Sequence, residues 1–356
     1  MLRSDWLAIM FSPVTIKDVA LVAGVHFTTV SMALRGHPAI AQLTRRRIEA
    51  IARRIGYRRS EVFTALSRQR KFLRQTRSIP SLLYLGRANS DRQFFEMAHH
   101  RQMLIGARRE AEALGYKLLV RRVGPGGLPP EQLQTYLSRT AALGVVIGAW
   151  DPALNVPLVD WSRLAAVKID SRHVLAQVPL VSFDQMKCVI RAHDQLTTLG
   201  YKRIGLALGE KDEDATDGLH LSGWFLSQSQ RVQSVADVPP LLFPAKTNPR
   251  TELLLLRRWI QLHRIDAVMC NWNSIFSMLA RIGYSAPKRI GCVCLCRGPG
   301  QKQLAGIVPN FDLVGQRAVS LLGSLIDEPE ECQSPAPLTS YVEGTWHAGP
   351  SIINQA

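Results

Sequence analysis

The sequence predicts an α/β protein with a small helical domain at its N-terminus and a larger body that contains parallel sheets. Two observations support this prediction. The first part of the chain is basic, shows a helical period of apolar residues, and ends in a polar stretch at residues 68–78. After that stretch, short β-rich segments alternate with segments of helical period. This alternation is typical of βαβ units and parallel sheets.

The composition is that of a globular protein with a large core. The chain is 46% hydrophobic, and its 356 residues suffice for two or three compact units. The longest apolar runs are too short to cross a bilayer, and the first residues, interrupted by Pro13, do not resemble a signal peptide. We therefore expect a cytoplasmic protein that binds no membrane. Residues 1–13 are expected to form a disordered arm, and Met1 and Met10 are alternative starts.

The net charge of +16 is concentrated near the N-terminus. Residues 1–78 contain 15 of the 44 Lys and Arg residues but 4 of the 28 Asp and Glu residues, an excess of +11. The remaining 278 residues carry an excess of +5. A basic surface is often merely solvated, but this asymmetry favours a polyanionic partner, and nucleic acid is the usual one.

Residues 14–59 are predicted to form a three-helix DNA-binding domain. The predicted helices span about residues 15–23, 27–34 and 44–55, with Thr44 as the N-cap of the third. Ala20 is small, Gly24 follows four positions later, and the apolar Val30 comes six beyond that. This spacing is the signature of a helix-turn-helix, because two helices must cross closely at the first position and turn tightly at the second.

Residues 14–71 resemble the headpiece of the lactose repressor family, and their sequence is VTIKDVALVAGVHFTTVSMALRGHPAIAQLTRRRIEAIARRIGYRRSEVFTALSRQRK. The resemblance implies a hinge helix and linker at residues 60–79. In the family this helix inserts a Leu into the minor groove of the operator, which unstacks one base step and bends the duplex. Leu66 matches that Leu, and Tyr57 matches the family's Tyr. The alternative role for Leu66 is packing against the body.

The resemblance also assigns residues that contact DNA. The base-reading positions of the second helix match His26, Phe27, Thr28 and, one turn later, Met32. Phe27 and Met32 cannot donate a hydrogen bond to guanine, so we expect apolar readout there, for example of a thymine methyl group. Thr29 and Ser31 are expected to contact phosphates, which fix the register of the protein on DNA without carrying sequence information.

The body, residues 80–347, is predicted to contain two parallel sheets that separate near Asp184. The predicted strands are Ser81–Gly86, Lys117–Val123, Gly144–Trp150, Ala165–Asp170, Arg203–Gly209, Asp266–Cys270 and Arg289–Leu295. The predicted helices are Phe94–Leu114, Pro130–Ala142, Gln185–Leu199, Leu219–Gln233, Arg250–His263, Ser274–Ile282 and Leu313–Ile326. The family resemblance extends over this region and implies a two-lobed body like that of periplasmic sugar-binding proteins, with three crossovers. The implied lobes are about 80–182 with 309–335, and 183–308 with 336–347.

Ligands of such bodies bind beyond the carboxyl ends of the strands or between the lobes. Compared with the family, His220 replaces an Arg that grips sugar hydroxyls, Cys296 replaces an Asp, and Trp272 with Asn273 replaces an Asn-Asp pair. We expect either a rebuilt site for a sugar or related metabolite, with Trp272 as a stacking platform, or a body that only dimerises and binds no effector. The candidate effector-binding residues are Asp170, Arg172, His220, Trp272, Asn273 and Cys296.

Other chemistry-bearing patterns have simpler interpretations. Cys292, Cys294 and Cys296 alternate along a predicted strand, and we interpret them as small core residues, since zinc usually requires a fourth ligand and loop spacing. The acidic run at residues 212–214 is expected to be a solvated loop. Catalytic and phosphate-binding motifs are absent from the sequence, so we expect neither enzymatic activity nor a cofactor or metal.

The sequence therefore predicts a homodimeric, repressor-type transcriptional regulator. Its expected partners are a double-stranded DNA operator and a small-molecule effector bound between the lobes. A two-lobed solute-binding protein is the first alternative, although the basic head argues against it. An enzyme built on the α/β body is the second.

Overall fold

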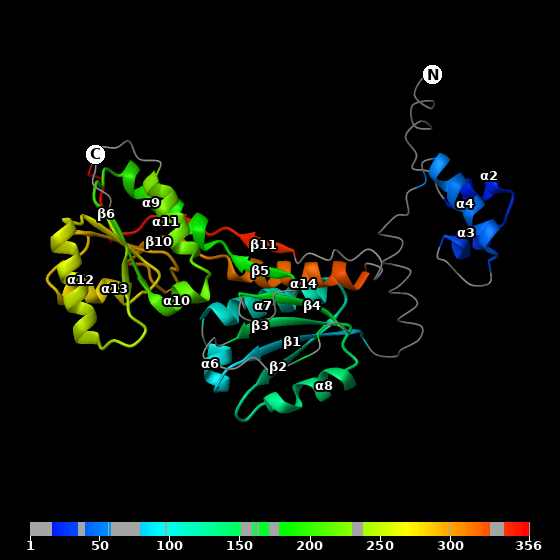
Figure 1. The fold of residues 1–356 in the computed structure, drawn as a ribbon, viewed down its shortest axis with the longest axis horizontal. Coiled ribbons are helices and arrows are strands. Elements are labelled where there is room, and N and C mark those ends of the chain that lie inside the picture. Colours follow the sequence, from blue (N-terminus) through cyan, green and yellow to red (C-terminus); the bar gives the residue numbers. More distant parts are fainter. Residues whose placement is uncertain are drawn as a thin grey trace, which may run out of the picture. The chain divides into compact units, whose positions relative to one another are not determined.

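The computed structural model divides the chain into two compact units, Met1–Ser78 and Ile79–Ala356 (Figure 1). The structure describes residues 16–34, 40–55, 57, 79–96, 98–150, 159, 161, 164–170, 178–229, 238–298, 300–327 and 338–355. The predicted arm at residues 1–13, the hinge helix with Leu66, and Arg172 lie outside the described residues. Within the described part, no helix is both long and apolar enough to span a membrane.

The N-terminal unit contains the three predicted helices. They are α2 (Ile16–Ala23), α3 (Phe27–Ala33) and α4 (Gln42–Arg54). Gly24 has a φ of +64°, a conformation that favours glycine, and it turns the chain between α2 and α3. The three helices enclose a small core formed by Val19, Ala20, Ala23, Val30, Ala33, Ile48 and Ala52.

The predicted N-cap of α4 is wrong. The helix begins at Gln42, its N-cap is Ala41, and no side chain caps it. Because the backbone N–H of Arg45 already donates to the carbonyl of Ala41 (3.0 Å), Thr44 lies inside the first turn. Leu43 in this first turn is 83% exposed and lies outside the buried stripe, so the apolar period did not show where the helix begins.

The first sheet of the body has six strands in the order β11-β5-β4-β3-β1-β2, all paired in parallel. They are β1 (Ser81–Arg87), β2 (Lys117–Val123), β3 (Gly144–Trp150), β4 (Ala165–Ile169), β5 (Leu180–Phe183) and β11 (Thr339–Val342). Helices α7 (Ala98–Ala113) and α14 (Phe311–Asp327) pack together over one face of this sheet, and the other face packs with α8 (Leu133–Arg139). The short helices α6 (Asp91–Glu96) and η1 (Pro130–Gln132) lie in the connections.

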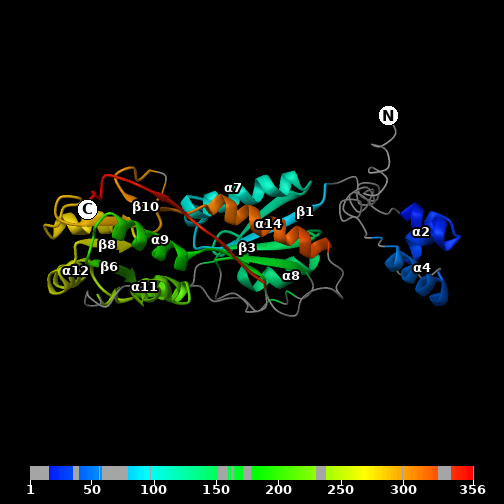
Figure 2. The ribbon, with the colours of Figure 1, turned by 90° about the horizontal axis from the view of Figure 1, so that it is seen from above.

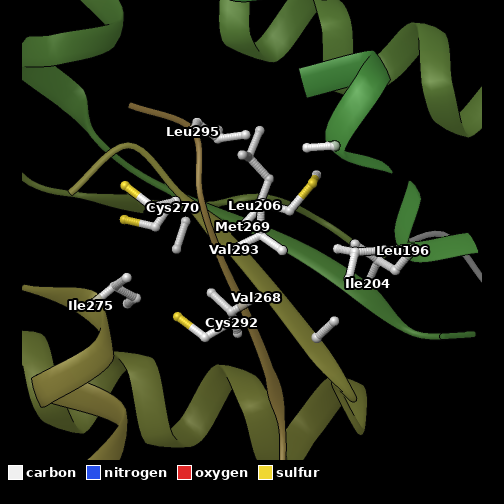
Figure 3. Packing of buried hydrophobic residues seen from close by; sticks show 14 of the residues in the cluster. Leu196, Ile204, Leu206, Val268, Met269, Cys270, Ile275, Cys292, Val293 and Leu295 are labelled. Atoms are coloured by element: carbon white, nitrogen blue, oxygen red, sulfur yellow. The ribbon is translucent and has the colours of Figure 1, made fainter. Parts of the chain in front are cut away.

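The second sheet also has six strands, in the order β12-β10-β9-β8-β6-β7, parallel except for β12. The strands are β6 (Ile204–Gly209), β7 (Leu241–Phe243), β8 (Ala267–Cys270), β9 (Gly291–Cys294), β10 (Ala305–Val308) and β12 (Thr345–His347). The helices are α9 (Gln185–Thr198), α10 (Glu210–Ala215), α11 (Leu219–Ser229), α12 (Pro249–His263) and α13 (Ile275–Arg281). Buried side chains of β6, β8 and β9 lie between helices on both sides of the sheet (Figure 3).

Three connections join the two sheets, as the family resemblance implies. The chain passes from β5 to α9 at Asp184, from β10 to α14 at residues 309–310, and from β11 to β12 at residues 343–344 (Figure 2). The expected assignment of residues 336–347 to the second lobe is therefore wrong for β11, which pairs with β5 in the first sheet. Four residues of strand are too few for the sequence pattern to show which sheet they join.

The acidic run is not a loop. Residues 212–214 lie within α10, and Glu213 is buried. The sequence suggested a solvated loop because the side chain that pairs with Glu213 lies outside the acidic run, on α11.

Candidate DNA-binding surface and ligand site

The N-terminus of α3 is held by a side-chain cap from His26. The Nδ1 atom of His26 accepts a hydrogen bond from the backbone N–H of Thr28 (3.4 Å) and lies 2.8 Å from the Thr28 hydroxyl. Its ring also contacts that of Phe27, with centroids 4.3 Å apart. With Nδ1 as the acceptor, Nε2 carries the proton and is left as a donor. His26 is therefore an N-cap as well as a predicted base reader.

Several of the side chains of α3 that are predicted to contact DNA are exposed to solvent. Phe27 is 44% exposed, an unusual exposure for a large aromatic side chain, and Thr28 is also exposed. Thr29 and Met32 are partly exposed, and the side chain of Ser31 lies outside the described residues. This surface offers an aromatic ring, a hydroxyl and an imidazole N–H, the kinds of group that read base edges.

Two further residues have roles inside the N-terminal unit. Tyr57 packs against the core of this unit, and its backbone N–H donates to the carbonyl of Ala52 (2.9 Å). Arg47 donates to the carbonyl of Ala23 (2.8 Å), the last residue of α2. Arg47 thus satisfies a carbonyl at the end of α2 and ties α4 to it.

In the body, Trp272 lies at the carboxyl-end edge of the second sheet, just after β8. Its indole Nε1–H donates to the carboxylate of Asp212, which follows β6. Asn271 donates to the same carboxylate oxygen (Nδ2 to Oδ2, 3.3 Å). The ring of Phe243, at the end of β7, lies 5.3 Å from that of Trp272 with a 30° tilt. Sequence analysis identified Trp272 but missed Asp212, Asn271 and Phe243, because these contacts join three separate strands.

His220 points into the interior between α10 and α11. Its Nδ1 lies 2.9 Å from Oε2 of Glu213, and both side chains are 6% exposed. The other Glu213 oxygen accepts the backbone N–H of Leu221 (2.8 Å). A buried carboxylate needs such partners, so this pair fixes the turn between the two helices.

Asp170 follows β4 of the first sheet and Cys296 follows β9 of the second, so both lie near the carboxyl ends of their strands. Asp170, after β4, accepts hydrogen bonds from the Ser182 hydroxyl (2.5 Å) and the Phe183 N–H (3.3 Å), and its φ is +46°. Burial raises the pKa of the Cys296 thiol to about 12, and the nearby Cys294 and Asp170 contribute in the same direction. Non-glycine residues with positive φ are concentrated at functional sites, which suits a ligand role for Asp170.

The cysteines of the second sheet are core residues, as predicted for Cys292 and Cys294, which are fully buried. Figure 3 shows Cys292 within this core. Cys294 donates to the side-chain oxygen of Asn273 (3.1 Å), which anchors a predicted effector-binding residue. Cys296 follows the strand and is half-buried. Among the described residues, no group of three or more His, Cys, Asp or Glu side chains is arranged to hold a metal ion.

Comparison with known proteins places these two units in one class, that of regulators with a helix-turn-helix head and a two-lobed body. Residues 15–60 match the family of bacterial regulatory proteins known as the lacI family. Over 202 residues the chain is 26% identical to the HTH-type transcriptional regulator reg1 of Streptomyces lividans, covering 55% of this chain and 54% of that protein. The match thus spans about half the length of its curated relatives.

Solved structures of the same fold cover nearly all of the chain. One is the transcriptional regulator CelR in complex with cellobiose, with a TM-score of 0.58 and 18% identity over 95% of this chain and 99% of that one. Another is the Lac repressor dimer bound to operator and the anti-inducer ONPF, with a TM-score of 0.55 and 18% identity over 96% and 100%. The resemblance to the lactose repressor family is confirmed: residues 15–60 form a lacI-family helix-turn-helix domain, and the body has the fold of such regulators.

Proposed function

We propose that the protein is a sequence-specific DNA-binding transcriptional regulator of repressor type. The observation that carries this proposal is the α3 surface: a helix-turn-helix whose second helix exposes Phe27 and Thr28, within a segment of net charge +11. The charge attracts the phosphate backbone, and α3 enters the major groove to read the bases. His26, Phe27, Thr28 and Met32 read base edges, while Thr29 and Ser31 contact phosphates.

The protein acts as a homodimer, so that two heads bind two half-sites of an operator. Two-fold symmetry of the operator then mirrors that of the protein. The Lac repressor, which shares this fold, binds its operator as a dimer, and this supports the same assembly here. Leu66 remains the proposed minor-groove wedge between the two half-sites.

An effector bound at the facing carboxyl ends of the two sheets controls DNA binding. Asp170, Trp272, Asn273 and Cys296 lie at those strand ends, where ligands of open parallel sheets bind. An effector shifts the equilibrium between DNA-binding and released states only by its difference in affinity for the two. His220 serves this site indirectly, by fixing the α10–α11 turn.

The first prediction tests the α3 surface. Phe27→Ala should weaken binding to a selected genomic operator about tenfold or more, because an apolar base contact is lost, and leave non-specific binding unchanged. Leu21→Ala is the matched control, since Leu21 is an exposed apolar residue (83%) on α2. Gel-shift titrations with the operator and a scrambled duplex give both affinities. Equal losses in the two variants would refute base reading by Phe27, whereas no DNA binding at all would overturn the proposal in favour of a solute-binding protein.

A further inference from the structure

The indole of Trp272 is held in place from three sides. Asp212 accepts its Nε1–H, Phe243 lies beside its ring, and Gly209 leaves the space that the ring occupies. A Cβ atom at Gly209 would lie 2.3 Å from Cζ2 of the indole, so a larger residue there would displace the ring. Trp272 is nevertheless only half-buried, which leaves part of the ring open to solvent.

This arrangement determines what the indole offers to a ligand. Its one polar atom is already bonded to Asp212, so the remaining surface is the π face. A π face carries negative electrostatic potential and attracts cations and the faces of other planar rings. A ligand rich in hydroxyl groups finds no donor on this side chain.

The surrounding groups are acceptors rather than donors. The Asp212 carboxylate lies at the indole, and the buried amide oxygen of Asn271 has no hydrogen-bond partner among the described residues. The Asp170 carboxylate is near Cys296, whose thiol is neutral because burial raises its pKa to about 12. Two exposed lysines, Lys211 and Lys246, lie at the same edge of the sheet.

Two buried basic side chains near this edge are bonded within the protein, whereas Lys211 and Lys246 are exposed. The imidazole of His220, in place of the family's sugar-gripping Arg, faces Glu213 in the interior. Arg297 is 6% exposed, and its Nε–H donates to the carbonyls of Gln301 (3.0 Å) and Leu304 (2.8 Å). A carboxylate or phosphate stacked on the indole would lie close to the carboxylate of Asp212, which repels it.

We propose that the carboxyl-end edge of the second sheet binds a planar, positively charged ligand, a cationic aromatic heterocycle, on the face of Trp272, and that Asp212 is the residue that positions this platform. The inference rests on the proposed function in taking this edge as the effector site. It replaces the expected sugar with a different chemical class. Asp212 has two effects: its hydrogen bond orients the indole, and its charge complements the cation.

The test uses two small probes with the same ring and opposite charge, the N-methylnicotinamide cation and the nicotinate anion. Quenching of tryptophan fluorescence in the full-length protein reports binding, and Trp272→Phe identifies the part due to this residue. We expect the cation to bind about tenfold more tightly than the anion, with quenching lost in Trp272→Phe. Equal or tighter binding of nicotinate, or quenching unaffected by Trp272→Phe, would overturn the proposed ligand class.

Variants on α10 separate orientation from charge. Asp212→Ala should weaken cation binding about tenfold, whereas Asp212→Asn, whose amide oxygen still accepts the indole N–H, should lose only the part due to charge. Asp214→Asn, an exposed neighbour on the same helix, is the matched control and should bind as the wild type does. Binding by Asp212→Ala equal to that of the wild type would refute the positioning role. If Asp212→Ala does not fold, the two Asn variants decide the charge effect and near-UV circular dichroism of Asp212→Asn decides the orientation.

Operator binding without probe, measured on the same variants, keeps this inference separate from the proposed function. Variants that bind operator but show no preference for the cation refute the ligand class alone. A wild-type protein that binds the cation but no DNA refutes the regulator proposal and leaves the site intact.

Discussion

At the scale of single residues, the cysteines near the strand ends act as uncharged side chains. Burial, the main cause, raises the pKa of Cys294 to about 11 and that of Cys296 to about 12. Cys296 stands where the resemblance places an Asp, so a negative charge of the family's site is replaced by a neutral group at neutral pH. The negative charge at this edge then comes from carboxylates such as Asp170 and Asp212.

The raised pKa values predict slow thiol chemistry in the folded protein. At pH 8 a thiol of pKa about 9 is about 10% thiolate, whereas one of pKa about 11 is about 0.1% thiolate, and the thiolate is the reactive form. Alkylation by iodoacetamide, followed by peptide mass spectrometry, should therefore be slower in the folded than in the urea-unfolded protein, by about a hundredfold for Cys294 and about a thousandfold for Cys296. Between pH 7 and 9.5 the folded thiols should stay slow, because they ionise only above this range. Equal rates in the two states would show that these thiols are exposed.

At the scale of elements, the closest helix pair in the described part of the body is α7 with α14. A Cβ atom at Gly106 would lie 1.8 Å from the carbonyl oxygen of Asp312, and one at Gly315 would lie 1.8 Å from that of Met103. The two helices thus touch backbone to backbone, which only glycine permits. Since α14 directly follows the crossover from β10, this contact fixes where the second connection between the sheets enters the first lobe.

Substitutions along α14 should therefore have opposite effects. Gly315→Ala forces α7 and α14 apart and should lower the free energy of unfolding by about 1–3 kcal/mol or more. Gly323→Ala, two turns further along the same helix, meets only Leu114 at an ordinary 3.4 Å and should be neutral or stabilising by up to about 1 kcal/mol. Urea unfolding followed by circular dichroism compares the two. Similar midpoints for both variants would mean that the helices do not pack this closely.

The elements also show which part of the fold the sequence could predict. The strands β2 and β3 were predicted with the observed bounds, because seven-residue β-rich runs between turn signals leave little ambiguity. Strands β5, β7, β10, β11 and β12 were missed, because runs of three or four residues are too short to show a period. Such short strands become recognisable only through the strands with which they pair in the folded sheet.

The residues of the candidate site were likewise predicted only in part. Trp272 was predicted because Trp272 and Asn273 stand where the family resemblance places an Asn-Asp pair, and an indole can serve as a stacking platform. Asp212 and Glu213 were interpreted as solvated, since nothing local distinguishes a carboxylate that binds Trp272 or His220 from one that faces water. His220 was taken as a ligand residue because its position matched the family, whereas its contacts depend on α10, which the sequence did not predict. The family resemblance predicted the position of His220 along the chain, but not the direction in which its side chain points.

At the scale of the whole molecule, most of the net positive charge lies in one of the two compact units. The residues 1–78 form one compact unit and carry an excess of +11, and the remaining 278 residues carry +5. Neutralising phosphates releases condensed counterions, so we expect the affinity of such a molecule for DNA to depend on salt through the first unit. The body, with an excess of +5 over 278 residues, should contribute less to the attraction.

The salt dependence of operator binding tests this division. The logarithm of affinity should fall with the logarithm of salt concentration with a slope of several units. Arg46→Gln and Arg53→Gln, exposed on α4, should each reduce the magnitude of the slope by about one unit if they neutralise a phosphate. Arg257→Gln and Arg258→Gln, equally exposed on α12 of the body, are the matched controls and should leave the slope unchanged. A slope near zero would refute DNA binding, and equal changes in both pairs would show that DNA also contacts the body.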